Sequence, residues 1–230
     1  MMQLNQFSDT AALNADFADK LIAILQQAIA ERGEAYLVVS GGKTPQALFT
    51  TLSHTDLAWN KVTVLLADDR WLSDDQPDSN ERLVKATLLQ QQAAAAKFIS
   101  LYTDTASAFD GEATIQARIA HLPTFDAVIL GMGEDGHTAS LFPCSAQLAA
   151  GLSDTAPAAL AVKPQTAPYE RMSLSKVRLL NSRHIFLHLV GANKLKVLEQ
   201  AMQAEDQTVM PIRAFLQHPA TTVAVMYTQN

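Results

Sequence analysis

Short runs of apolar residues recur along the chain, and stretches with helical spacing lie between them. The apolar runs cover residues 36–40, 62–67, 125–130, 184–190 and 222–226. A run that is apolar at nearly every position is typical of a strand buried on both faces of a parallel sheet. These segments are therefore predicted to be strands.

The segments between the apolar runs are amphipathic. Residues 9–31 place apolar side chains at helical spacing, and Gly33 follows as a stop signal. Further helices are predicted at residues 45–53, 80–92, 105–120 and 194–204. Alternation of strands and helices favours parallel strands joined by right-handed crossovers, with ligands at the C-terminal ends of the strands. We therefore expect an α/β fold with a mostly parallel central sheet flanked by helices.

Residues 149–170 form the least regular part of the sequence. They contain Pro157, Pro164 and Pro168 among small residues, which favours an excursion or a lid. A linker is disfavoured because too few residues follow for a second domain. The length of 230 residues suits one layered domain, so we expect residues 1–230 to form a single domain.

The composition is that of a globular protein, with 48% hydrophobic and 17% charged residues. The formal net charge of -6 gives no broad cationic surface, so nucleic acid is not expected as a partner. An anionic substrate would instead need a local pocket of basic side chains and backbone N–H groups.

The number of cysteines and the length of the apolar runs indicate the cellular compartment of the protein. The chain has one cysteine, Cys144, and can form neither an intramolecular disulfide nor a multi-cysteine zinc site. Its N-terminus does not resemble a signal peptide, and its apolar runs are far shorter than the roughly 18 residues of a membrane span. We expect a cytoplasmic protein with no membrane partner.

Three loops that follow predicted strands carry the candidate chemistry. The first is SGGKTP, residues 40–45, whose two glycines permit close backbone approach and whose Thr44 can cap the next helix. Backbone N–H groups at such a turn bind anions, so this loop is a candidate phosphate cradle. It is not a nucleotide P-loop, because Leu37 stands where that motif needs a glycine. The alternative is a tight turn with an exposed Lys43.

The second loop begins with DDRW. Asp68, Asp69 and Arg70 place two carboxylates and a guanidinium at a strand end. The guanidinium of Arg70 can bind a phosphate or an oxyanion through two parallel hydrogen bonds. The alternative is a solvated loop whose charges pair with one another, and we prefer it for the acidic residues further along. Ser79 or Asn80 can cap the helix that follows.

The third loop contains GMGEDG, residues 131–136, which has the glycine spacing of a dinucleotide-binding turn. Glu134 and Asp135 would repel a pyrophosphate at this turn. The residues about 20 positions later also lack the strand pattern that such a site requires. A dinucleotide oxidoreductase is therefore disfavoured.

His137 lies two residues after Asp135. An imidazole beside a carboxylate has a defined tautomer and titrates near working pH, which suits a general base. A lone histidine is more often structural or exposed. We assign that role to His54, His121, His188 and His218. No spacing typical of a zinc site is present, so no catalytic metal is expected.

In their order, SGGKTP, LADDRWLSDDQPDSNERLV and LGMGEDGHTASLFP resemble the loops of the 6-phosphogluconolactonase family, which is related to glucosamine-6-phosphate deaminases. RMSLS and GANK are similar to later segments of that family, and the match extends over nearly the whole chain. The resemblance implies a Rossmann-like three-layer fold, no cofactor, and hydrolysis of 6-phospho-D-glucono-1,5-lactone in the oxidative pentose phosphate pathway. We expect a monomer or a small homo-oligomer.

The resemblance also implies roles for individual residues. His137 is expected to be the base, oriented by Asp135 or Glu134, with Arg70 as a candidate oxyanion donor. The residues expected to bind the phosphate or the sugar are Ser40, Gly41, Gly42, Lys43, Thr44, Asp68, Arg171 and Lys194. Neutral His137 would take a proton from the attacking water and return it to the ring oxygen as the lactone opens.

The sequence departs from the family pattern at two positions and distinguishes two reactions at a third. Asp69 stands where the family usually has glutamate, and Cys144 where it usually has glycine. Deaminase relatives typically carry a catalytic glutamate where this chain has Phe142. An isomerising deaminase needs several acid-base groups, so we favour hydrolysis over deamination. A non-catalytic sugar-phosphate-binding module is disfavoured because His137 is retained.

Overall fold

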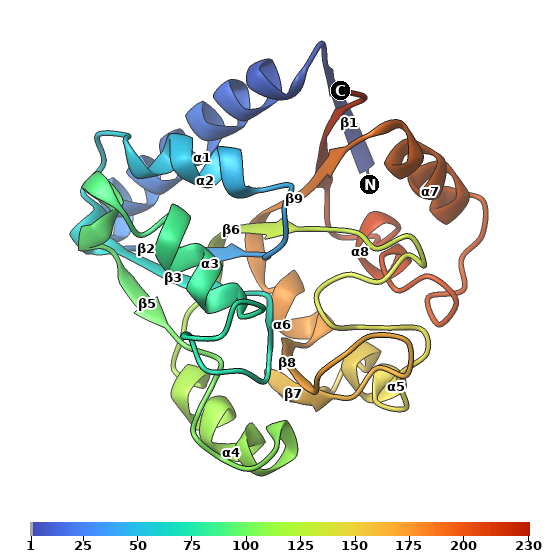
Figure 1. Ribbon diagram of the computed structural model, residues 1–230. Helices are drawn as coiled ribbons and strands as arrows, with labels where there is room; N and C mark the ends of the chain where they lie inside the picture. The colour runs from blue at the N-terminus through green and yellow to red at the C-terminus, as the bar shows by residue number, and fades with distance from the viewer. Residues whose placement is uncertain (1) are drawn as a thin grey trace.

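A seven-stranded sheet forms the centre of the protein (Figure 1), whose computed structural model describes residues 2–230. The strands of this sheet are β1 (Met2–Phe7), β2 (Ala35–Val39), β3 (Val62–Leu66), β5 (Lys97–Ile99), β6 (Phe125–Leu130), β9 (Ser182–Val190) and β10 (Val223–Thr228). Their order is β1-β10-β9-β6-β2-β3-β5, and all neighbours are parallel. All residues of β3 and β6 are buried, as their continuous apolar runs predict.

Helices cover both faces of this sheet. The helices of residues 2–230 are α1 (Thr10–Arg32), α2 (Gln46–Ser53), α3 (Asn80–Thr87), α4 (Ala108–Ile119), α5 (Leu148–Leu152), α6 (Lys176–Leu180), α7 (Ala192–Met202) and α8 (Arg213–Leu216). Figure 1 shows α1 and α2 on one side of the sheet and α6 and α8 on the other. The expected three-layer α/β fold is therefore confirmed. No helix within residues 2–230 has the length and apolarity to cross a membrane.

The order in which successive strands are added to the sheet reverses between the parallel neighbours β2 and β6. From β2 the chain continues to β3 and β5 toward one edge, and from β6 it continues to β9 and β10 toward the other. In an open parallel sheet, the crevice at the C-terminal ends of two such strands is the usual place for a ligand. The loops SGGKTP and GMGEDG leave β2 and β6 at this point.

A second, smaller sheet lies beside the crevice. It is antiparallel, in the order β4 (Asp68–Arg70), β8 (Arg171–Leu174), β7 (Ala159–Val162). Arg70 is paired with Arg171 in this sheet. Residues 149–170 are less irregular than expected, because they include most of α5 and the whole of β7. Their role as an excursion or a lid stays a prediction. Strand β7 is only four residues long and depends on pairing with β8, which its own sequence does not reveal.

Several predicted boundaries need correction. Helix α2 has Pro45 as its N-cap residue and no side-chain cap, so Thr44 does not cap it. The helix predicted at 80–92 ends at Thr87, and a 3-10 turn follows at Gln91–Ala95. The helices predicted at 105–120 and 194–204 are α4 and α7. Two predictions are confirmed: Gly33 ends α1 with a φ of 83°, and the Ser79 side chain caps α3.

Candidate active site

A cavity opens at the C-terminal ends of β2, β6 and β9, next to the small sheet. The predicted site residues that line it are Ser40, Gly41, Gly42, Lys43, Thr44, Asp68, Arg70, His137, Arg171 and Lys194. The fold thus brings together residues from three loops and two later segments. Asp135 and Glu134 do not line the cavity, and each contacts a residue near its edge.

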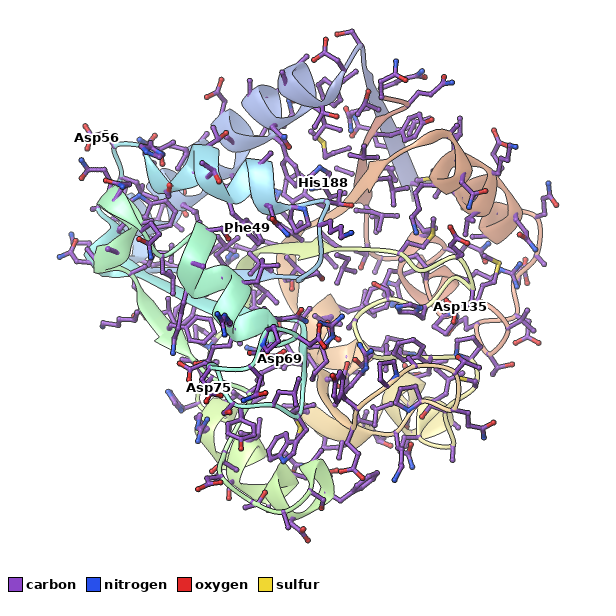
Figure 2. The ribbon with its side chains drawn as sticks, viewed as in Figure 1. Phe49, Asp56, Asp69, Asp75, Asp135 and His188 are labelled. Atoms are coloured by element: carbon purple, nitrogen blue, oxygen red, sulfur yellow. The ribbon has the colours of Figure 1, made fainter. Side chains whose placement is uncertain are left out.

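His137 is held by its neighbour in the loop after β6. Its Nδ1 lies 2.5 Å from Asp135 Oδ1, and its backbone N–H donates to the same oxygen at 3.1 Å. Within residues 2–230 its Nε2 has no hydrogen-bond partner, so this nitrogen is available to a ligand or a water. Burial alone would raise the pKa of Asp135, but the hydrogen bond and charge of His137 bring it below the usual value. Figure 2 shows Asp135 on this loop.

Glu134 points elsewhere. Its Oε1 accepts a hydrogen bond from Asn193 Nδ2 at 2.9 Å, which ties the loop to the first turn of α7. Of the two carboxylates considered as orienting groups for His137, Asp135 makes the contact.

Asp69 organises the loop that carries Arg70. Its carboxylate accepts hydrogen bonds from the backbone N–H groups of Arg70 and Asn80 at 2.7 Å and of Glu81 at 2.9 Å. Burial raises the pKa of Asp69 to about 7, against the lowering effect of these bonds. The Asn80 side chain donates to the Asp68 carbonyl at 3.1 Å. Asp69 therefore serves as a structural anchor at the start of α3.

The half-buried Arg70 and the buried Arg171 are cross-strand neighbours at the cavity wall. The Nε atoms of both are buried and have no hydrogen-bond partner within residues 2–230. Arg70 Nη1 donates to the Asp78 carbonyl at 2.6 Å, and Arg171 Nη1 lies 3.8 Å from Asp68 Oδ2. Burial lowers the pKa of Arg171, and Arg70 adds to this effect while Asp68 opposes it. An anionic ligand would supply the missing acceptors and reduce the repulsion.

The cavity is also lined by a primary ammonium and by backbone amides that the protein leaves unused. Lys194 Nζ donates to the Met132 carbonyl at 2.8 Å, which leaves further N–H donors for a ligand. Within residues 2–230, the backbone N–H groups of residues 41–44 donate to no protein atom. Gly42 has a φ of 99°, a conformation that glycine adopts readily. These features suit a phosphate between Lys194 and the SGGKT loop.

His188 and Asn80 also line the cavity, although the sequence did not predict either of them to belong to the site. His188 is 4% exposed, and neither ring nitrogen has a hydrogen-bond partner within residues 2–230. Burial lowers its pKa to about 4. Its position inside an apolar strand gave no signal of the cavity. The sequence predicted Asn80 only as a possible cap of the helix that follows.

The glycines of GMGEDG leave space for His137 and allow the turn of its loop. A Cβ on Gly133 would overlap His137 and Asp135, and Gly136 has a φ of 74°. The next helix along the chain, α5, begins only at Leu148, so GMGEDG does not lead directly into a helix as a dinucleotide-binding turn does. No group of three or more potential metal ligands is found within residues 2–230.

Comparisons with known proteins agree on one family. The family model described as glucosamine-6-phosphate isomerases/6-phosphogluconolactonase matches residues 8–225. The 6-phosphogluconolactonase of Rhizobium meliloti is 40% identical over 223 residues, covering 96% of each chain. That of Pseudomonas putida is 37% identical, covering 95% of this chain and 90% of the relative. The crystal structure of a 6-phosphogluconolactonase from Shewanella baltica has a TM-score of 0.97 and 44% identity, covering 99% of this chain and 98% of that chain.

Proposed function

Because this chain belongs to the glucosamine-6-phosphate isomerase/6-phosphogluconolactonase family, we propose that it hydrolyses 6-phospho-D-glucono-1,5-lactone to 6-phospho-D-gluconate. This is a step of the oxidative pentose phosphate pathway. The observation that carries the proposal is the pairing of His137 with Asp135 at the edge of a cavity lined by basic side chains. The cavity combines a base with basic side chains, as a phosphorylated lactone requires.

The phosphate binds between Lys194, Arg171 and the SGGKT loop. Lys194 and Arg171 supply positive charge, and the amides of residues 41–44 supply N–H donors that the protein leaves unused. Lys43 and Thr44 add their side chains at the mouth of the loop. Because the phosphate is remote from the lactone carbonyl, its binding can position the reacting carbon near His137 and lower the entropic part of the activation barrier.

Hydrolysis begins when His137 Nε2 takes a proton from a water that attacks the lactone carbonyl carbon. Asp135 Oδ1 accepts a hydrogen bond from the Nδ1–H group, which fixes the tautomer and stabilises the imidazolium that forms. The bond from carbon to ring oxygen then breaks, and His137 returns the proton to that oxygen. The carboxylic acid product ionises at neutral pH, so each turnover releases one proton to solvent.

Arg70 stabilises the oxyanion of the tetrahedral intermediate. Its buried Nε has no partner within residues 2–230, and its guanidinium is anchored at Nη1 by the Asp78 carbonyl. A donor aimed in this way at developing charge typically contributes about 2.7 to 4 kcal/mol. Asp68 Oδ2, at 3.8 Å from Arg171 Nη1, holds the guanidinium of Arg171 in place. Glu134 acts indirectly, because its bond to Asn193 fastens α7 and with it Lys194.

Deamination of glucosamine-6-phosphate is the competing reaction within the family, and it is less favoured here. Phe142 stands where the deaminase pattern has a glutamate, and its side chain cannot transfer a proton. A non-catalytic binding module would not need the contact between Asp135 and His137. We also propose a single-domain, cytoplasmic protein that is a monomer or small homo-oligomer and binds no nucleic acid, in keeping with its net charge of -6.

An assay of acid release tests the proposal. The lactone is generated with glucose-6-phosphate dehydrogenase, and its opening is compared with and without the protein. We expect the wild type to accelerate opening and to leave glucosamine-6-phosphate unchanged. General-base assistance is worth roughly 10² to 10⁴ in rate, so His137→Ala should lower kcat by about that factor at nearly unchanged affinity for the product. Equal kcat values for the two proteins would exclude His137 as the base.

A further inference from the structure

Phe142 touches two side chains that line the cavity. Its ring centroid is 4.0 Å from that of His137, and the two ring planes differ by 24°. The guanidinium of Arg171 lies over the same ring, 5.0 Å from the centroid. Phe142 is 4% exposed and is not among the residues that line the cavity. A buried aromatic ring therefore connects the proposed base with a proposed phosphate ligand.

The chain between His137 and Phe142 is fixed in place. A tight turn closed by an isolated antiparallel bridge folds Phe142 back onto His137. Within this turn, the Ser140 hydroxyl donates to the Asp68 carboxylate, and the Ser140 backbone N–H donates to Ser173 Oγ at 3.1 Å. The turn is thus fastened to the small sheet that carries Arg171. The stack of His137, Phe142 and Arg171 is a built arrangement rather than a chance contact of mobile side chains.

We propose that Phe142 is a positioning residue for the hydrolysis. Its ring stacks on the imidazole of His137 and fixes the orientation of the imidazole plane, and the guanidinium of Arg171 packs on the Phe142 ring. This inference rests on the proposed function. Asp135 binds one edge of the imidazole, but a single hydrogen bond at Nδ1 leaves the ring free to tilt about that bond. The stacked ring of Phe142 removes this freedom and keeps Nε2 directed at the attacking water.

Phe142 acts most strongly after His137 has taken the proton. The face of an aromatic ring carries negative charge and attracts a cation more strongly than it attracts a neutral ring. The imidazolium that forms during the reaction is therefore stabilised more than the neutral imidazole before it. An interaction that strengthens toward the transition state raises kcat rather than affinity.

The test is Phe142→Leu, which keeps an apolar side chain and removes the ring. The energy of a cation–ring interaction rises from exposed to desolvated sites, and this range corresponds to about 2- to 30-fold in rate. We expect kcat for the lactone to fall by this factor, with a smaller change in KM. Phe98→Leu is the matched control, because Lys85 Nζ lies 5.8 Å from the Phe98 ring centroid and Phe98 does not line the cavity. Its kcat should equal that of the wild type.

Proton NMR provides a readout that a general loss of packing would not produce. In the wild type, the ring current of Phe142 should shift the carbon-bound imidazole protons of His137 upfield, and Phe142→Leu should return them toward ordinary values. The signals are assigned from their loss in His137→Ala. An unshifted His137 signal in the wild type overturns the inference, even where Phe142→Leu does not fold.

The two proposals fail in different ways. A wild type that does not hydrolyse the lactone refutes the proposed function. An active wild type with an unchanged kcat in Phe142→Leu refutes only the positioning role. Equal losses of kcat in Phe142→Leu and Phe98→Leu also refute it, because the effect would then come from packing in general.

Discussion

Gly133 leaves the space that the imidazole of His137 occupies. A Cβ at this position would overlap His137 Nδ1 and Asp135 Oδ1. A Cβ at Gly131, in the same loop, would meet no atom of another part of residues 2–230 within 4 Å. The backbone of both glycines is open to other residues, since neither has a φ in the left-handed region. The two positions therefore separate the effect of crowding the histidine from the effect of changing the loop.

We expect Gly133→Ala to lower kcat strongly and Gly131→Ala to leave kcat within a few-fold of the wild type. Displacement of a catalytic group by about 1 Å can reduce a rate by about 10²-fold, and we predict a loss of that order for Gly133→Ala. Because Gly131 lines the cavity, its variant should show any effect mainly in KM. Steady-state kinetics with the lactone distinguish the two. Similar kcat values for both variants would contradict this role of Gly133.

Some features of the site follow from neighbouring residues in the sequence, and others depend on packing. Asp135 and His137 are two positions apart, so their contact could be expected from the loop alone. The stack on Phe142 could not, because it depends on a turn fastened to the distant Asp68 and Ser173. His188 was also missed, since an apolar strand does not reveal which side chains its end presents to a cavity.

At the scale of elements, the strands that carry the arginines were the hardest to predict. Strand β4 consists of Asp68, Asp69 and Arg70, and β8 begins with Arg171. Neither resembles a buried apolar run, because the charged residues of both face the cavity or anchor its loops. Their pairing joins segments about 100 positions apart, Asp68 with Ser173. Strands of this kind are set by their partners rather than by local propensity.

Helix α7 provides a test of the phosphate site. Lys194 lines the cavity from the first turn of this helix, whereas Lys196 is exposed and does not line it. A hydrogen bond to a charged group contributes about 1.5 to 3 kcal/mol, so Lys194→Ala should weaken binding of 6-phosphogluconate by about 10- to 150-fold. Lys196→Ala removes the same charge from the same helix and should bind as the wild type.

Isothermal titration calorimetry measures both affinities, and unphosphorylated gluconate serves as a second ligand. If Lys194 contacts the phosphate, its replacement should have little effect on gluconate. An equal loss of affinity for both ligands would place Lys194 at the sugar instead.

At the scale of the whole molecule, the reversal of strand order between β2 and β6 determines where the site forms. Alternating apolar runs and amphipathic stretches were sufficient to predict a parallel sheet with ligands at the C-terminal strand ends. They did not predict β1, because its exposed and half-buried residues form an edge strand with polar positions. The protein carries a net charge of -6, yet Arg70, Arg171 and Lys194 converge on one cavity. The fold thus concentrates positive charge locally against the overall charge.

The stability of the molecule toward acid depends on His188, which packs against Phe17 at a centroid distance of 5.4 Å. Burial lowers its pKa to about 4 in the folded protein, whereas an unfolded histidine has a pKa of about 6.5. Between these values the unfolded chain binds a proton that the folded protein does not. The contribution of His188 to stability is therefore fully present above about pH 6.5 and is lost as the pH falls toward 4.

His188→Phe keeps an aromatic ring against Phe17 and removes the titration. The two pKa values imply that the wild type loses about 2 kcal/mol through His188 between pH 8 and pH 5. The free energy of unfolding of His188→Phe, minus that of the wild type, should therefore be larger at pH 5 than at pH 8 by about this amount. Urea unfolding at the two pH values measures it, and the exposed His121 supplies the control His121→Gln. If the difference in unfolding free energy between His188→Phe and the wild type did not change with pH, His188 would bind protons equally in the folded and unfolded states. That result would contradict the lowered pKa of the buried imidazole.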